Sequence, residues 1–135
     1  MKHQTSIILF FTIGLIIMGF FSACSPKITR NIHKSYPALD DSAEVTIIHI
    51  GEIIPFKYET LGTIILGDGG MTNKSKCNYE TLLALAIEET KKVGGNAIKI
   101  VVDMPPRVEF KPGGVFIYQC HSLSVIILKT IDDID

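Results

Sequence analysis

The side chains best suited to chemistry in this chain belong to three cysteines, Cys24, Cys77 and Cys120, and to the histidines His49 and His121. Thiolates and imidazoles are preferred ligands of zinc and other transition metals, whereas two thiols in an oxidising compartment can form a disulfide. Adjacent residues of a strand point to opposite faces, so Cys120 and His121 cannot both reach one metal ion without a bulge. We therefore expect His49 and His121 to be ordinary sheet residues, and we predict no metal site and no cofactor.

The stretch before Cys24 has the pattern of an export signal. A basic start at residues 2–3 leads into an apolar run at 7–21 and then into two small residues. A membrane-spanning helix needs about 18 or more apolar residues, so this run is short for a permanent anchor. A basic start, a short apolar run and small residues before a cleavage point are typical of a signal peptide. We predict that residues 1–23 form one.

The residues next to Cys24 indicate which kind of signal this is. Phe21 is too bulky for the position three residues before an ordinary cleavage site. Residues 22–24 (Ser-Ala-Cys) instead resemble a bacterial lipobox, in which the cysteine becomes the first mature residue and is acylated. The resemblance implies a membrane anchor at Cys24, since each buried methylene contributes about 0.8 kcal/mol. In such lipoproteins an Asp after the cysteine favours the inner membrane; Ser25 stands there, so we expect a periplasm-facing lipoprotein of the outer membrane.

The number of cysteines is consistent with export. If Cys24 carries lipid, Cys77 and Cys120 are the two that remain, and an isolated pair in an oxidising compartment most often forms a disulfide. The spacing lacks the CxxC pattern of redox-active pairs. The alternatives are two unlinked buried cysteines at 77 and 120, and an uncleaved signal anchor with a buried cysteine at 24.

Composition and motifs exclude several classes of function. The chain has 13 Lys and Arg against 14 Asp and Glu, which gives a formal net charge of −1. A nucleic-acid-binding domain carries a strongly basic surface, so we expect no nucleic-acid partner. The glycine-rich loop at 67–76 matches neither common phosphate-binding motif, and the chain contains no GxSxG or HExxH. We predict that the protein is not an enzyme.

Hydrophobic periodicity predicts one α+β domain at residues 44–131, after a tether at 24–43 and before an acidic tail at 132–135. The tether is polar and is interrupted by two prolines. The expected elements, in order, are strands at 44–50 and 58–66, a helix at 79–93, a strand at 96–103, a short edge strand at 108–110, and a stretch at 115–129 that is either two strands broken near 121–122 or one bent strand. The order β-β-α-β-(β)-β predicts one helix packed on a small, mostly antiparallel sheet.

The helix at 79–93 has the clearest pattern of these elements. Apolar residues recur at helical spacing, Asn78 is a favourable N-cap, and Gly94-Gly95 follows the last turn. In the preceding strand, Gly62 predicts a bulge or a close approach of two backbones. Lys111-Pro112-Gly113-Gly114 suits a type II turn.

Short motifs in this order resemble a known domain family. Residues 61–64 (LGTI) precede the helix and residues 94–98 (GGNAI) lead into the next strand. The pattern resembles that of YbjQ-type domains, which carry a heavy-metal-binding label, and that of RcsF-like outer-membrane lipoproteins, which sense envelope stress for the Rcs phosphorelay. The resemblance covers residues 58–129 and implies the fold and a Cys77–Cys120 bridge. RcsF-like domains have four cysteines and a long basic tether, which this chain lacks, so no partner contacts are implied.

These observations lead to one leading hypothesis and two alternatives. The leading hypothesis is a lipid-anchored envelope protein that acts as a non-enzymatic interaction or stress-sensing module, with an unidentified envelope protein as its partner. The first alternative is a periplasmic metal-binding domain of the YbjQ type. The second is a structural envelope protein that forms homo-oligomers through an exposed sheet edge.

Overall fold

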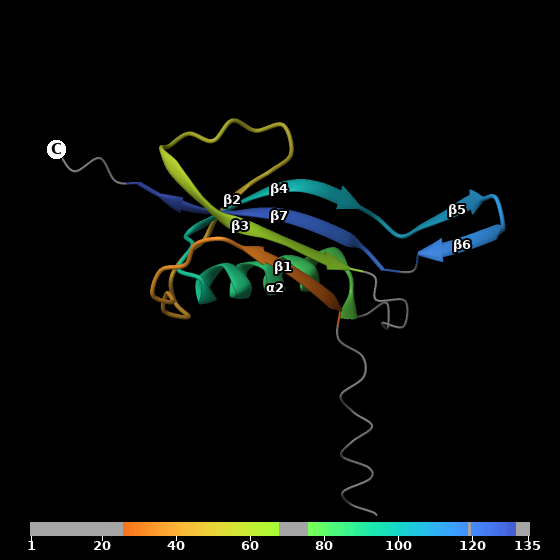
Figure 1. Ribbon diagram of the computed structural model, residues 1–135, viewed down its shortest axis with the longest axis horizontal. Coiled ribbons are helices and arrows are strands. Elements are labelled where there is room, and N and C mark those ends of the chain that lie inside the picture. Colours follow the sequence, from red (N-terminus) through yellow and green to blue (C-terminus); the bar gives the residue numbers. More distant parts are fainter. Residues whose placement is uncertain (1–25, 68–75, 119, 132–135) are drawn as a thin grey trace, which may run out of the picture.

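The computed structural model describes residues 26–67, 76–118 and 120–131. In these ranges the chain forms, in order, β1 (Lys27–Ile32), β2 (Thr46–Ile48), β3 (Tyr58–Gly67), α2 (Tyr79–Lys92), β4 (Ala97–Met104), β5 (Arg107–Lys111), β6 (Gly114–Tyr118) and β7 (Ser122–Thr130). Strands β1, β3, β7, β4 and β2 lie side by side in that order as a five-stranded sheet, and β5 and β6 form a two-stranded sheet. Figure 1 shows α2 along one face of the larger sheet and the β5–β6 hairpin projecting from one end.

Antiparallel pairing dominates the larger sheet. β2 runs parallel to β4, while β1–β3, β3–β7 and β4–β7 are antiparallel. The predicted α+β class, with one helix on a mostly antiparallel sheet, is therefore confirmed for the part of the chain that the structure describes. The predicted order is not fully correct, because β1 precedes the first expected strand.

Of the predicted tether at 24–43, the structure describes residues 26–43, and these differ most from the prediction. Within this segment, Lys27–Ile32 is β1, which pairs with β3 from the Lys27–Gly67 pair to the Ile32–Gly62 pair. Residues 27–32 thus belong to the folded domain, which was predicted to begin at 44. The sequence does not predict this strand because only one of its faces packs against the core. Two isoleucines supply that face, and the other residues of the strand are polar.

The residues after β1 are also held against the domain. The backbone N–H of Tyr36 donates to the carbonyl oxygen of Val93, and that of Leu39 donates to the carbonyl oxygen of Lys91. These bonds satisfy carbonyl groups at the end of α2 that have no partner inside the helix. Residues 33–43 therefore cross the end of the helix instead of forming a free linker.

The other elements follow the sequence pattern closely. Asn78 caps α2, with its side chain accepting a hydrogen bond from the backbone N–H of Thr81. Of the two alternatives for residues 115–129, the structure shows two strands, β6 and β7. In the turn between β5 and β6, Gly113 has a φ of +110°, the sign that a type II turn requires at its third residue.

The larger sheet is covered by α2 on one face and in part by the segment 49–57 on the other. On the face toward α2, the buried core consists of Leu61, Ile64, Leu66, Cys77, Leu82, Ala86, Ile98, Ile100, Cys120, Leu123, Val125 and Ile127. On the opposite face, Ile54 and Phe56 from the segment 49–57 pack against Ile48, Ala97 and Leu128. Figure 1 shows this segment, in yellow, crossing the sheet on the side away from α2. We call the face opposite α2 the outer face.

Gly62 permits the close contact between β1 and β3. The β3–β7 register shifts between Thr60 and Gly62, as expected for a bulge. A Cβ atom at position 62 would lie 2.4 Å from the carbonyl oxygen of Asn31 and 2.8 Å from the Cα of Ile32. Both of the expectations for Gly62, a bulge and a close approach, are confirmed.

An ion pair joins β1 to the helix. The Arg30 guanidinium is hydrogen-bonded to the buried carboxylate of Glu89, whose other oxygen accepts a hydrogen bond of 3.0 Å from Lys92. Mainly through the hydrogen bond from Arg30, these partners lower the pKa of Glu89 from its ordinary value of 4.5 to about 2. Since the carboxylate is stabilised in the folded state, the pair favours folding above the ordinary pKa of Glu89 and loses this effect as the pH falls toward 2.

We predict that Glu89→Gln lowers the free energy of unfolding at pH 7 by about 1–3 kcal/mol. The wild type should lose this contribution between about pH 5 and pH 2, whereas the variant should show a flatter pH dependence there. Urea denaturation across this pH range measures both effects. Glu88→Gln is the matched control, because Glu88 is exposed and pairs with the same lysine. Equal effects at the two positions would contradict the role assigned to Glu89.

Candidate functional site

A disulfide joins the start of the helix to the start of β7. Cys77 lies one residue before the N-cap of α2, and Cys120 lies two residues before β7; both side chains are buried. The two sulfurs are bonded, and the Cα atoms are 5.2 Å apart. The backbone N–H of His121 also donates to the carbonyl oxygen of Cys77, at 3.0 Å. The bridge thus fixes the position of α2 relative to the central strand of the sheet.

A small polar cluster lies beside the bridge. The Nε2 atom of His121 is hydrogen-bonded to the carboxylate of Asp103 in β4, and the imidazole meets the ring of Tyr79 edge-on, with 5.5 Å between ring centroids. Burial raises the pKa of Tyr79, and the negative charges of Asp103 and Glu80 raise it further. These contacts link α2, β4 and β7 at one point, so we assign the cluster a structural role.

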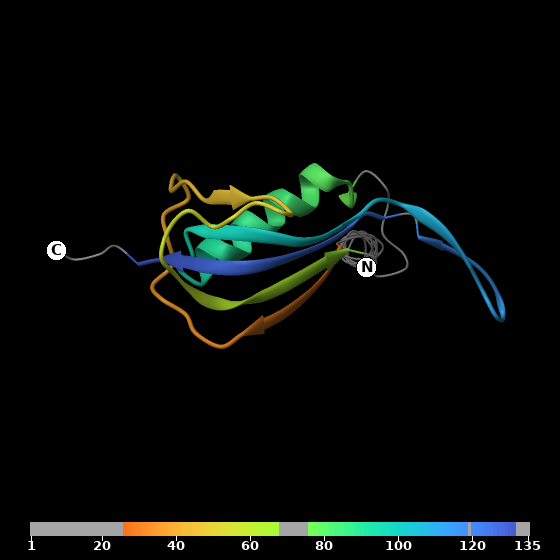
Figure 2. The ribbon, with the colours of Figure 1, turned by 90° about the horizontal axis from the view of Figure 1, so that it is seen from above.

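The disulfide, the start of β1 and the hairpin all lie at one end of the larger sheet. Register pairs Lys27 with Gly67, Leu66 with Leu123, and Ser122 with Met104, so β1 begins where β3 and β4 end and where β7 begins. We call this the disulfide end of the sheet. The hairpin leaves from the same end, since β5 follows β4 after two residues. Figure 2 shows β1 starting at the end from which the hairpin projects.

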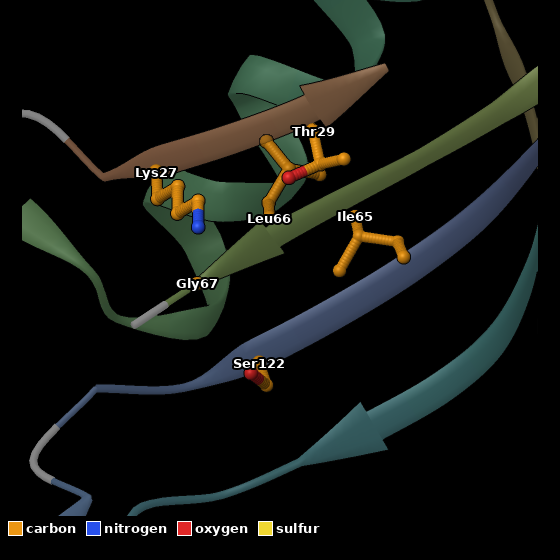
Figure 3. Close-up of a pocket in the computed structure, with 6 residues that line it drawn as sticks. All are labelled: Lys27, Thr29, Ile65, Leu66, Gly67 and Ser122. Atoms are coloured by element: carbon orange, nitrogen blue, oxygen red, sulfur yellow. The ribbon is translucent and has the colours of Figure 1, made fainter. Parts of the chain in front are cut away.

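The outer face is hollowed at the disulfide end. Figure 3 shows the lining residues, which come from three neighbouring strands: Lys27 and Thr29 from β1, Ile65, Leu66 and Gly67 from β3, and Ser122 from β7. The hollow has a volume of about 190 Å³ and opens widely to solvent. Pockets for drug-sized ligands usually have about 300–1,000 Å³, so this shape suits a side chain of a macromolecular partner better than an enclosed small molecule.

The hollow offers a mixed surface to such a partner. Ile65, which is 53% exposed, provides an apolar contact. Lys27 adds an ammonium group, and Thr29 and Ser122 add hydroxyl groups that both donate and accept hydrogen bonds. The segment 49–57 covers the outer face farther along the sheet, near Leu128 in β7, and leaves this end open. We therefore regard the hollow as the candidate interaction site.

The predicted site residues have three different outcomes. Cys77 and Cys120 form the predicted bridge. Cys24, the predicted acylation site, lies outside the described residues. His49 and His121 are far apart along the sheet. His49 directly follows β2, whose last residue lies beside Lys99 of β4. Lys99 in turn pairs with Ile126, which is five residues after His121. Within residues 26–67, 76–118 and 120–131, no group of three or more His, Cys, Asp or Glu side chains is placed to hold a metal ion.

The residues of the hollow carry no motif that marks them as a site in the sequence. They are common types from three strands that are distant in sequence, and only strand order brings them together. The available signal was the alternation in residues 27–32, which places Lys27 and Thr29 on one face of a strand.

Comparison of this chain with protein-family models, with curated proteins and with solved structures gives no significant match. Among the described residues, no helix has both the length and the apolar character needed to cross a bilayer.

We predict that the double variant Cys77→Ala with Cys120→Ala lowers the free energy of unfolding by about 4 kcal/mol, the chain-entropy estimate for a loop of this length. Treating the wild type with a reductant should produce a similar loss, while the double variant should not respond. Urea denaturation with and without reductant measures the difference. Detection of free thiols at both positions in the unreduced, denatured wild-type protein would contradict the bridge.

Proposed function

We propose that this chain is a lipid-anchored protein of the bacterial envelope, whose α+β domain acts as a non-enzymatic interaction or stress-sensing module. The observation that carries the proposal is the pairing of the cysteines. The Cys77–Cys120 bridge leaves Cys24 as the third cysteine of the chain, and Cys24 follows a signal-like segment and stands in a lipobox-like motif. A buried structural disulfide is typical of exported proteins, which supports a location outside the cytoplasm.

The shape of the described surface supports a binding role. The hollow beside Ile65 is shallow and open, and it lies on a sheet face that the segment 49–57 covers only in part. The lysine and hydroxyl groups around an apolar centre suit an extended segment of a protein that carries a carboxylate next to an apolar side chain. We propose that an envelope protein supplies this segment. A relationship to RcsF-like stress sensors of the outer membrane is part of the same proposal.

The anchor also has a geometric consequence for the hollow. Two residues separate Cys24 from Lys27, which lines the hollow, so at most about 10 Å of extended backbone would connect an acylated Cys24 to this site. The bound partner would therefore be near the membrane surface, as expected for another protein of the same membrane. Ser25 after the acylated cysteine favours the outer membrane.

We predict that the mature protein begins at Cys24 and carries acyl chains there. Mass spectrometry of protein extracted from membranes of a bacterial host should find an N-terminal peptide heavier by these chains. Cys24→Ala should abolish the added mass and metabolic labelling with palmitate, whereas Cys77→Ala with Cys120→Ala should retain both. A mature N-terminus without lipid would contradict the proposal.

We further predict that a photo-crosslinking amino acid at position 65 captures a distinct envelope protein in intact cells. A crosslinker at position 53 is the matched control, since Ile53 is also exposed but belongs to the segment on the covered part of the outer face. Lys27→Glu should weaken the capture at 65, because it reverses the charge beside the hollow. The same crosslinked products at both positions would argue against a specific site.

A further inference from the structure

The β5–β6 hairpin is a separate amphipathic element. Val108 pairs with Ile117 and Phe110 pairs with Val115, so the four side chains lie on one face of the ribbon. Their exposed fractions are 53% for Val108, 82% for Phe110, 57% for Val115 and 64% for Ile117. Contiguous apolar side chains with such exposure usually mark a binding surface. We call these four residues the apolar face of the hairpin.

The opposite face of the hairpin carries the charged residues Arg107, Glu109 and Lys111, with Phe116 in register across from Glu109 and Tyr118 across from Arg107. Glu109 forms ion pairs of 2.5 Å with Arg107 and 2.6 Å with Lys111. The Arg107 guanidinium lies over the ring of Tyr118, 4.3 Å from its centroid, and Lys111 also approaches this tyrosine. All of these contacts are made within the ribbon itself. The three charged groups leave a surplus of one positive charge.

The hairpin and the N-terminal segment leave the domain at the same end. Two residues separate Met104, which ends β4, from Arg107, which begins the hairpin, and the N-terminal segment enters at Lys27, which begins β1. Three strand spacings separate β1 from β4, or about 14 Å. Cys24 lies three residues before Lys27 in the sequence, and a fully extended chain of three residues spans about 10 Å at most. An acylated Cys24 would therefore hold the root of the hairpin close to the bilayer surface.

We propose that the apolar face of the hairpin inserts into the interfacial layer of the bilayer that holds the acyl chains. This inference rests on the proposed lipid anchor and deepens it by assigning a second contact with the same membrane. An amphipathic segment lies in the membrane interface with its apolar face about 5–10 Å deep and its polar face toward water. The hairpin has the apolar face, and its opposite face carries Arg107, Glu109 and Lys111. The surplus positive charge of these three residues suits anionic headgroups.

Proximity to the anchor is the reason to assign a bilayer rather than another occupant. Once the acyl chains are inserted, contact of the hairpin with lipid is intramolecular, and its effective concentration is high. Because few residues connect Cys24 to the domain, the hairpin can reach the same bilayer only if it lies at the end of the domain where the acylated segment enters. The positions of Lys27 and Met104 at one end of the sheet meet this requirement.

The absence of Trp from the chain allows a direct test. Phe110→Trp introduces a single fluorophore on the apolar face, and the matched control Ile53→Trp introduces one at a residue that is 89% exposed, outside the hairpin. The full, acylated chain of each variant is placed in vesicles of phosphatidylethanolamine and phosphatidylglycerol with brominated acyl chains. We expect bromine to quench the indole of the Phe110→Trp variant and to shift its emission to shorter wavelength, while the emission of the Ile53→Trp variant stays as in buffer. Val115→Trp, on the same face, should behave like Phe110→Trp.

The outcomes separate the two proposals. If none of the variants is recovered with the vesicles, the lipid anchor fails and this inference fails with it. If all are recovered but the two hairpin variants are no more quenched than Ile53→Trp, the anchor stands and the inserted hairpin is wrong. The emission of the Phe110→Trp variant could instead shift to shorter wavelength without lipid, with a shift that grows with protein concentration. That result would show that the apolar face binds a second copy of the chain, and it would overturn the inference.

Discussion

Burial of the central strand on both faces is the constraint on which this structure depends. β7 pairs with β3 from Leu123 to Thr130 on one side and with β4 from Ser122 to Leu128 on the other. Alternate side chains of β7 face α2 and the segment 49–57, and the strand is accordingly apolar through most of its length. Since unpaired backbone groups in such a position would be costly, β7 cannot leave the sheet without unfolding the domain. The disulfide anchors the start of this strand to the start of the helix.

Strands and helices with more buried apolar residues could be predicted more accurately from the sequence. The helix at 79–92 has a cap, a periodic apolar stripe and glycines after its end, so local signals agree with the packing. β1 has only two apolar residues, because one face and one edge of the strand need no core contacts. β2 has three residues, fewer than the apolar segment around it suggested, since the chain then leaves the sheet to cover the outer face.

The candidate site was harder to predict than the fold. The bridge between Cys77 and Cys120 followed from cysteine count and compartment, which are properties of the whole chain. The hollow depends on the neighbourhood of β1, β3 and β7, and sequence order does not reveal that β1 lies next to β3. The hairpin was only partly predicted, because residues 108–110 were assigned to a sheet edge rather than to a ribbon that projects from the domain.

The attachment of β1 has a mechanical consequence. Hydrogen bonds between antiparallel strands run perpendicular to the strands. A tension applied at Pro26 along the axis of β1 therefore loads all six residue pairs of the β1–β3 ladder in shear, together with the Arg30–Glu89 pair. A tension applied across the sheet would instead peel the strand away one pair at a time. A chain held at its N-terminus would thus resist being drawn away along the strand and yield more readily to a sideways force.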